Sequence, residues 1–253
     1  THDWVRQAVF IAKEMPGTPV KLIWTREEDM THGRYHPVTQ CRMRAALDRD
    51  GNLTGLHMRI SGQSILAAIA PQRMVDGRDP VTFQGLNPGG PEAAIGYTIP
   101  NLLIDHAMRN PHILPGFWRG VNLNPNAIYL ECFMDELAHA AGQDPPAFRL
   151  KLMDNHPKHR AVLQAVADKI GWSSKPPEGV YRGLCQTMGF GSYVAGAAAV
   201  SVSDQGELKL HRIAAATDPG HAVHPPQNDA QAAGSSVSGL PAPLSAARTA
   251  PHG

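Results

Sequence analysis

The stretch from Leu114 to Gly142, LPGFWRGVNLNPNAIYLECFMDELAHAAG, decides the fold, because a loop turns directly into a long apolar helix there. The helix is expected from about Ala127 to Ala141, where apolar residues recur at intervals of three and four. This stripe consists of Leu130, Phe133, Met134, Leu137, Ala138 and Ala141. Gly142 follows at a position where helices commonly end. The Trp118-Arg119-Gly120 segment therefore precedes a core-facing helix.

Regular elements are also expected after this helix. Asp144 is a typical N-cap before prolines, and the second helix that it starts runs to Leu152. A third helix covers residues 159–172 and stops at Gly171, and the Pro-rich segment 173–182 predicts a linker. Beyond the linker, two alternating strands meet at a Gln205-Gly206 turn.

Upstream of Leu114 the pattern changes several times along the chain. A helix at residues 1–15, a buried strand at 18–25 and a charged loop at 26–37 are expected in turn. A hairpin with an Asp50-Gly51 turn follows, and the residues available for one sheet face are Ala46, Leu53, Leu56 and Met58. The segment Ser61–Pro115 predicts loops with short strands, including 102–109. Helices and strands in separate runs favour the α+β fold class.

Composition excludes several classes of function. The 253 residues are 42% hydrophobic and carry a formal net charge of +1. The chain therefore lacks the excess of positive charge that is typical of nucleic-acid-binding proteins. No apolar run approaches the ~20 residues of a membrane-spanning helix, so no transmembrane segment is expected in this chain. The three cysteines lack CxxC spacing, which argues against an iron–sulfur cluster or structural zinc here.

Two loops are candidates for binding an anionic ligand. In FWRG, residues 117–120, Arg119 offers five donors in a fixed fork, Gly120 allows close approach, and the helix N-terminus adds positive potential. A buried arginine–carboxylate pair beside a core Trp118 explains that segment equally well. In GFGSYVAG, residues 189–196, glycines surround Ser192 and Tyr193, which suits either an anion or a tight turn before a strand.

Three longer blocks carry a family resemblance. They are PVKLIWTREEDMTHGRYHP, FWRGVNLNPNAIYLECFMDELAHAAGQDPPAFRLKLM and FGSYVAGAAAVSVSDQGELKLHRIAAATDPGHAV. Together they resemble the molybdopterin-binding large subunits of the molybdenum hydroxylases, the xanthine oxidase and aldehyde oxidase family. Within this family the similarity is greatest to the bacterial isoquinoline 1-oxidoreductase beta subunits and their aldehyde-oxidising relatives.

The resemblance implies a fold and a chemistry. The fold is part of a two-subdomain molybdopterin-binding arrangement that clamps the cofactor. The chemistry is molybdenum-dependent hydroxylation of an N-heteroaromatic or aldehyde substrate, with water as the oxygen source and electrons passing to [2Fe–2S] clusters on a small partner subunit. The resemblance also allows the cytosine dinucleotide form of the molybdopterin cofactor. It leaves the substrate, the electron acceptor and the compartment open.

The resemblance also implies two groups of cofactor-binding residues. Arg119 and Gly120 match the family's arginine–glycine loop, and the whole predicted set is Trp118, Arg119, Gly120, Val121, Asn122, Phe190, Gly191, Ser192 and Tyr193. A further turn and helix of the family pattern match at positions where a structural role is equally expected: Asp218, Gly220, Gln231 and Gly234. No metal ligand is expected among these residues.

Other parts of the family pattern are missing from these 253 residues. The family's catalytic glutamate lies in a Gly-x-Gly-Glu element that this sequence lacks, so no catalytic residue is assigned. We expect an internal fragment, inactive alone, with a first subdomain at 1–172 that is incomplete at its N-terminus. Residues 183–240 start a second segment, and 241–253 form a disordered or aberrant tail. The alternative function is a non-catalytic protein-binding module that uses the Arg119 loop and the Ser61–Pro115 surface.

Overall fold

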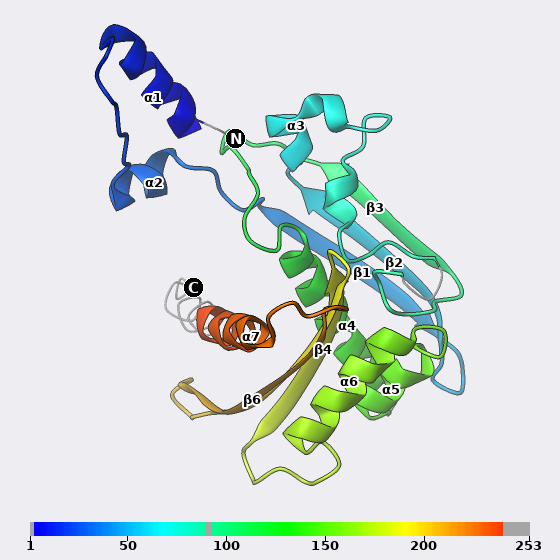
Figure 1. Cartoon of the computed structure of the whole chain (residues 1–253). Coiled ribbons are helices and arrows are strands. Elements are labelled where there is room, and N and C mark those ends of the chain that lie inside the picture. The colour runs from blue at the N-terminus through cyan, green and yellow to red at the C-terminus, as the bar shows by residue number, and fades with distance from the viewer. Residues whose placement is uncertain (1–2, 90–92, 240–253) are drawn as a thin grey trace. The chain divides into compact units, whose positions relative to one another are not determined.

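The computed structural model describes residues 3–89 and 93–239 and combines helices with two three-stranded sheets (Figure 1). The mixture of separate sheets and helices confirms the predicted α+β class. In chain order the elements are α1 Asp3–Glu14, α2 Arg26–His32, β1 Thr39–Leu47, β2 Leu53–Gly62, α3 Ile65–Ile69, the 3-10 turns η1 Pro71–Arg73 and η2 Pro80–Phe83, β3 Leu102–Met108, α4 Leu123–Ala140, α5 Pro145–Lys151, α6 Pro157–Ile170, β4 Tyr181–Gly189, β5 Ser192–Val202, β6 Leu208–Asp218 and α7 Pro225–Gly239.

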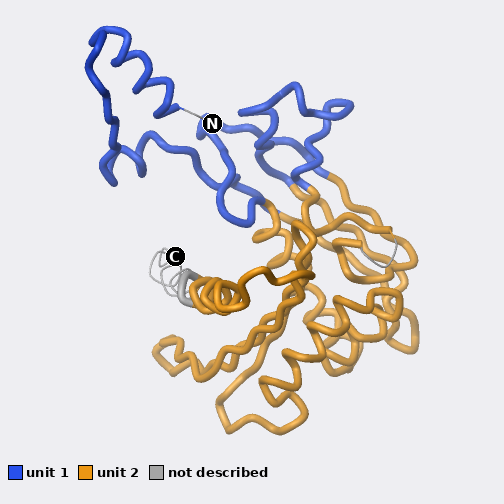
Figure 2. The backbone as a smooth tube through the Cα atoms, in the orientation of Figure 1, with its two compact units in different colours: residues 1–40, 61–82, 106–121 blue, residues 41–60, 83–105, 122–253 orange. Residues whose placement is uncertain are grey.

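The chain divides into two compact units (Figure 2). Unit 1 takes the residues up to 40 together with 61–82 and 106–121. Unit 2 takes 41–60, 83–105 and the described residues from 122 onward. The subdomain boundaries expected at residues 172 and 183 stay a prediction, and the expected tail at 241–253 lies outside the described residues.

The predicted hairpin of β1 and β2 is confirmed, and it forms a sheet in the order β1-β2-β3. Asp48 Oδ1 organises its turn by accepting hydrogen bonds from the main-chain N–H groups of Asp50 and Asn52. The expectation for Ala46 was wrong, because alternate residues of a strand point to opposite faces and Ala46 is exposed. The face of β1 that packs on the core consists of Cys41, Met43, Ala45 and Leu47.

The second sheet belongs to unit 2, and its buried residues form one core cluster with those of β2 and of the helices around it. β4, β5 and β6 pair antiparallel in that order. α6 packs against all three strands and α4 packs against β4. Three of the β5 side chains that are buried on the face towards α6 are small, namely Ala195, Ala197 and Ala199, and the fourth is Tyr193. The predicted stripe of the long helix is also confirmed, because Leu130, Met134, Leu137 and Ala138 are buried.

Helix ends follow the predicted signals closely. Asp144 caps α5 and accepts a hydrogen bond from Ala147 N at 3.3 Å, while its other oxygen accepts one from Trp172 Nε1 at 2.8 Å. Gly171 ends α6 in the left-handed conformation, with φ +77°. The start of α4 at Leu123 is earlier than predicted, and β4 begins at Tyr181, inside the segment expected to be a linker.

The N-terminal segment differs from its prediction in two places. Residues 26–32 form a helix and not a loop, because Thr25 Oγ1 caps it by accepting from Glu28 N and the first turn is acidic. Residues 18–25 have the composition of a strand but form none. A strand requires a partner, and within the described residues no main-chain hydrogen bond joins 19–24 to another segment.

Candidate functional site

The Arg119 loop has an unusual backbone at the end of unit 1. Gly120 and Val121 both have positive φ, +83° and +50°, and Val121 N donates a hydrogen bond to Trp118 O at 2.7 Å. A left-handed conformation is rare for a β-branched residue and costs about 1–3 kcal/mol, so such residues concentrate at functional sites. His36 holds the strained residue in place, because its Nε2 lies 2.9 Å from Val121 O.

The side chains of this loop face solvent in unit 1. Trp118 is 61% exposed and Arg119 is also exposed. The interpretation of the segment as a buried ion pair beside a core tryptophan is therefore wrong. An exposed guanidinium is suited to bind an anionic group.

Asn122 belongs to unit 2 and begins α4 there. It is only 4% exposed, and its main-chain N–H donates to Gln84 Oε1 at 3.2 Å. Asn126 Nδ2 donates to Gln84 O at 2.9 Å. Gln84 thus fastens the first turn of α4 through both its side chain and its main chain.

The second predicted loop is a two-residue turn between β4 and β5. Gly189 pairs with Ser192, and between them Phe190 and Gly191 have φ of +54° and +80°. The interpretation as a tight turn before a strand is confirmed, since positive φ at both central positions is typical of a hairpin turn. Within residues 3–89 and 93–239, only three non-glycine residues have positive φ, and Val121 and Phe190 are two of them.

Tyr193 and Ser192 lie on opposite faces of β5. Tyr193 is buried on the face that α6 covers, and its ring packs edge-on against His159 with centroids 4.8 Å apart. Ser192 lies on the other face, where it lines a cavity of about 540 Å³. Of the nine residues predicted from the sequence, Ser192 is the one found in the wall of this cavity.

The cavity lies between the sheet β4-β5-β6 and α7, which Figure 1 shows on the side of the sheet away from α6. The strands contribute apolar and small polar side chains to one wall, and α7 contributes mostly polar side chains to the other. Its polar side chains are those of Cys185, Thr187, Ser192, Thr217, Asn228, Gln231, Ser235 and Ser236, whereas the side chain of Gln186 points to the other face of the sheet. None of these described lining residues is charged, so the cavity suits a polar ring system held by hydrogen bonds.

Cys185 is the cavity's titratable group. Solvent reaches its side chain, yet the thiol lies in a concave surface surrounded by protein atoms. This burial raises the pKa of the thiol to about 11. Cys185 is therefore a neutral thiol at pH 7 and contributes no thiolate for a metal or a nucleophile.

A buried polar network lies next to the cavity and was not predicted from the sequence. The carboxylate of Glu131 accepts hydrogen bonds from Tyr97 Oη at 2.7 Å, Arg149 Nε at 3.1 Å and Gln186 N at 3.2 Å. Burial raises the pKa of Glu131, although the Arg149 guanidinium and the Tyr97 hydroxyl favour its charged form. His159 extends the network, because its Nδ1 lies 2.6 Å from Gln186 Oε1.

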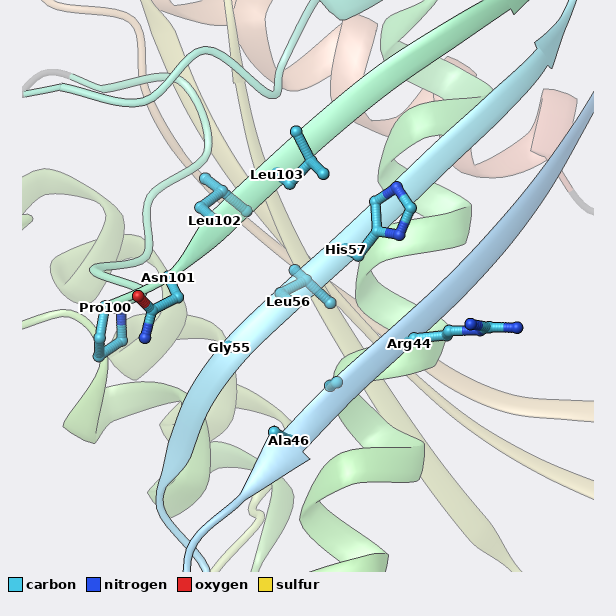
Figure 3. Close-up of a pocket in the computed structure, with 10 residues that line it drawn as sticks. Arg44, Ala46, Gly55, Leu56, His57, Pro100, Asn101, Leu102 and Leu103 are labelled. Atoms are coloured by element: carbon cyan, nitrogen blue, oxygen red, sulfur yellow. The ribbon is translucent and has the colours of Figure 1, made fainter.

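A second depression of about 600 Å³ lies on the outer face of β1, β2 and β3 (Figure 3). Arg44, His57 and Leu103 come to it from the three neighbouring strands. Beside it, Asp105 accepts hydrogen bonds from His57 and Arg59. No residue predicted to bind the cofactor lies in this depression.

Neither a metal cluster nor a membrane helix is found among the described residues. In residues 3–89 and 93–239 no group of three or more His, Cys, Asp and Glu side chains could hold a metal ion. No helix of the same part of the chain has both the length and the hydropathy needed to cross a bilayer.

Comparison with known proteins gives a family match and several relatives. The family model described as "Molybdopterin cofactor-binding domain" matches residues 5–153. The beta subunit of isoquinoline 1-oxidoreductase from Brevundimonas diminuta is 26% identical over 230 residues, which cover 88% of this chain and 29% of that protein. The membrane-bound aldehyde dehydrogenase [pyrroloquinoline-quinone] of Gluconacetobacter polyoxogenes is 26% identical over 262 residues, 94% of this chain and 34% of that protein.

One solved structure supports the fold, and a second is reported beside it. Quinoline 2-oxidoreductase from Pseudomonas putida 86 matches 75% of this chain and 25% of its own, with 17% identity and a TM-score of 0.51. The aldehyde oxidoreductase from Desulfovibrio gigas matches 74% of this chain and 22% of its own, with 18% identity and a TM-score of 0.44. The chain spans about a third or less of the relatives that it matches.

Proposed function

Because the chain belongs to the family of molybdopterin cofactor-binding domains, we propose that it is the cofactor-binding part of a subunit that hydroxylates an N-heteroaromatic or aldehyde substrate. The two relatives described above are named as an isoquinoline oxidoreductase and an aldehyde dehydrogenase, which supports these substrate classes. The observation that carries the proposal is that the family match over residues 5–153 includes the strained Arg119 loop. The second strained loop, at Phe190 and Gly191, follows the matched residues.

The residues present fit such a cofactor. In unit 1 the exposed Arg119 fork binds an anionic group of the cofactor, and Gly120 and Val121 give the adjoining loop its left-handed backbone. In unit 2, Ser192 and Gln231 line an uncharged cavity whose hydroxyl and amide groups donate to ring and phosphate oxygens. His36 and Gln84 orient these parts, since they hold Val121 O and Asn122 N respectively.

When bound, the molybdopterin cofactor supplies the two-electron oxidation of a C–H carbon. We infer that water provides the oxygen atom and that the electrons pass to a [2Fe–2S] centre on a small partner subunit. Two relatives are named as single subunits, one of isoquinoline 1-oxidoreductase and one of nicotinate dehydrogenase, which supports a multi-subunit enzyme. The residues of this chain bind and orient the cofactor and shield it, and no proton transfer is assigned to them.

Isotope labelling tests the reaction class. The intact enzyme that contains this chain is incubated with isoquinoline or an aromatic aldehyde and a redox dye, in ¹⁸O-labelled water under ordinary dioxygen. We expect ¹⁸O in the product at the enrichment of the water. The opposite labelling, with ¹⁸O₂ in ordinary water, serves as the control. Oxygen derived from dioxygen would overturn the assignment of water as the oxygen source. An intact enzyme that contains no molybdenum and shows no turnover would overturn the proposal as a whole and favour a protein-binding module.

A further inference from the structure

His159 is a titratable side chain that lies fully buried between α6 and the sheet β4-β5-β6. Its Nε2 lies 2.8 Å from the main-chain oxygen of Ala93, and its Nδ1 lies 2.6 Å from Gln186 Oε1. A main-chain oxygen only accepts hydrogen bonds, so Nε2 carries a proton and donates to Ala93. The protonation of Nδ1 follows from the atom of Gln186 that faces it.

The side-chain amide of Gln186 has one favourable orientation, because its other neighbours are also acceptors. Gln186 Nε2 lies 3.4 Å from Ile95 O and 3.4 Å from Glu131 Oε1. With the amide turned over, the oxygen of Gln186 would face both of these oxygens, and no hydrogen atom would lie between them. Gln186 therefore presents its oxygen to the imidazole ring, and His159 Nδ1 donates to it.

We infer that His159 is an imidazolium, protonated on both ring nitrogens, and that it positions the β4–β5 hairpin behind the candidate cofactor cavity. Burial alone favours the neutral ring. Loss of the Nδ1 proton, however, would leave a nitrogen lone pair 2.6 Å from the oxygen of Gln186. The hydrogen bonds around the ring therefore require its charged form.

The buried network also supplies counter-charge for the imidazolium. In the described part of this network, the carboxylates of Glu131 and Asp135 are paired with one guanidinium, that of Arg149. The other titratable side chains packed around the ring and the network are Tyr97, His156, Lys158 and Tyr193. A second cation at His159 balances the second carboxylate, as buried charges require.

The neighbouring residues leave a fitted space for this ring. Gly96 has φ +69°, and a Cβ at this position would lie 2.5 Å from His159 Nδ1. On another side the ring of Tyr193 packs edge-on, with centroids 4.8 Å apart. A side chain at position 96 would displace the imidazole from its acceptors. The ring is therefore held by the segment before β3 as well as by β4 and β5.

The imidazolium acts on the cavity through the two strands that it contacts. Gln186 alternates along β4 with Cys185 and Thr187, whose side chains line the cavity on the opposite face. Tyr193 alternates in the same way with Ser192 on β5. The imidazolium thus fixes the back of the strands whose front forms the cavity wall. This positioning role rests on the cofactor site proposed above.

Nitrogen NMR of the intact subunit, labelled with ¹⁵N-histidine, tests the protonation. At about pH 8 an ordinary histidine is neutral, since its pKa is roughly 6.5. We expect a histidine that keeps N–H groups at both ring nitrogens at this pH. In Gln186→Met, whose side chain has a similar size but only a weak acceptor, the same histidine should lose its Nδ1 proton. The matched control Gln164→Met, at an exposed position of α6, should change nothing. Absence of a doubly protonated histidine, or one that is unchanged in folded Gln186→Met, would overturn the inference.

The cofactor content of the same variants tests the positioning role. Loss of outer-shell support commonly weakens binding about tenfold or more, so the Gln186→Met subunit should retain less than about half of the native molybdenum and pterin. Gln164→Met should retain all of it, and circular dichroism verifies that both variants fold. Native content in a folded Gln186→Met subunit would refute the positioning role and leave the proposed function intact. A native subunit without molybdenum would instead overturn the proposed function, and the positioning role with it.

Discussion

Phe190 has a backbone conformation that is unfavourable for a residue with a large side chain. It occupies a left-handed position, φ +54°, at the tip of the β4–β5 hairpin and leaves 80% of its side chain exposed. Little burial offsets the strain at this position. Backbone strain that does not help the chain to fold is commonly found at functional sites, where the side chain or the turn is needed for function. Val121, held by His36 in the other candidate loop, shows the same conflict.

Substitution of Phe190 by asparagine should therefore stabilise the chain. Asparagine tolerates the left-handed region, so we expect Phe190→Asn to raise the free energy of unfolding by about 0.5–1 kcal/mol. Urea unfolding followed by circular dichroism measures the change. The control Val202→Asn, at an exposed position of β5, should be neutral or destabilising because asparagine is disfavoured in strands. A destabilised Phe190→Asn would show that the phenyl ring makes contacts that outweigh the strain.

Single residues of the site were partly predictable from the sequence. The patterns of glycine beside arginine and of glycine beside aromatic residues predicted binding loops at 118–122 and 190–193. The sequence could not show that Ser192 enters a cavity and Tyr193 a core, because that depends on which face of β5 is covered by α6. Gln231 matched the family pattern, but its place in the cavity wall required the position of α7.

At the scale of elements, buried charges connect helices α4 and α5 to strand β4. Arg149 is fully buried and donates to Glu131 Oε2 at 3.1 Å, to Glu131 O at 2.7 Å and to Asp135 Oδ1 at 2.5 Å. Glu131 in turn accepts from the main chain of Gln186 in β4. The network fixes how these elements pack beside the cavity.

Removal of the cation should be strongly destabilising. Arg149→Leu leaves the Glu131 carboxylate buried without its counter-charge, and we expect a loss of about 3–5 kcal/mol in the free energy of unfolding. The double variant Arg149→Leu with Glu131→Gln should recover part of this loss, because the fully buried charge at position 131 is gone and the Asp135 carboxylate, which also loses Arg149, is a third exposed to solvent. Denaturant titrations of the two variants measure both values. A loss below about 1 kcal/mol for Arg149→Leu would show that the network contributes little to packing.

Elements with strong local signals were predicted correctly, and those that depend on a partner were not. The helix stripe of α4, the Asp144 cap and the Asp50-Gly51 turn are local, and all are confirmed. The segment 18–25 has strand composition without a paired neighbour, so composition gave the wrong answer. The Glu131 network was missed because a carboxylate within an apolar helix stripe does not reveal the arginine that neutralises it.

At the scale of the whole molecule, the chain has the family's fold and two separately packed units. The candidate residues are shared between them: Trp118 to Val121 belong to unit 1, and Asn122 with Phe190 to Tyr193 belong to unit 2. Family membership follows from the match to residues 5–153, whereas the cofactor contacts of single residues are the proposal that remains to be measured.

The molybdenum content of the intact subunit after substitution of Arg119 tests the central claim most directly. Loss of a charge-assisted contact of about 1.5–3 kcal/mol weakens binding by roughly 10- to 100-fold. We therefore predict that purified Arg119→Ala retains only a small fraction of the molybdenum and pterin of the native subunit. Arg73→Ala, which removes another exposed arginine of unit 1, should retain all of it. Native molybdenum and pterin content in a folded Arg119→Ala subunit would contradict the account.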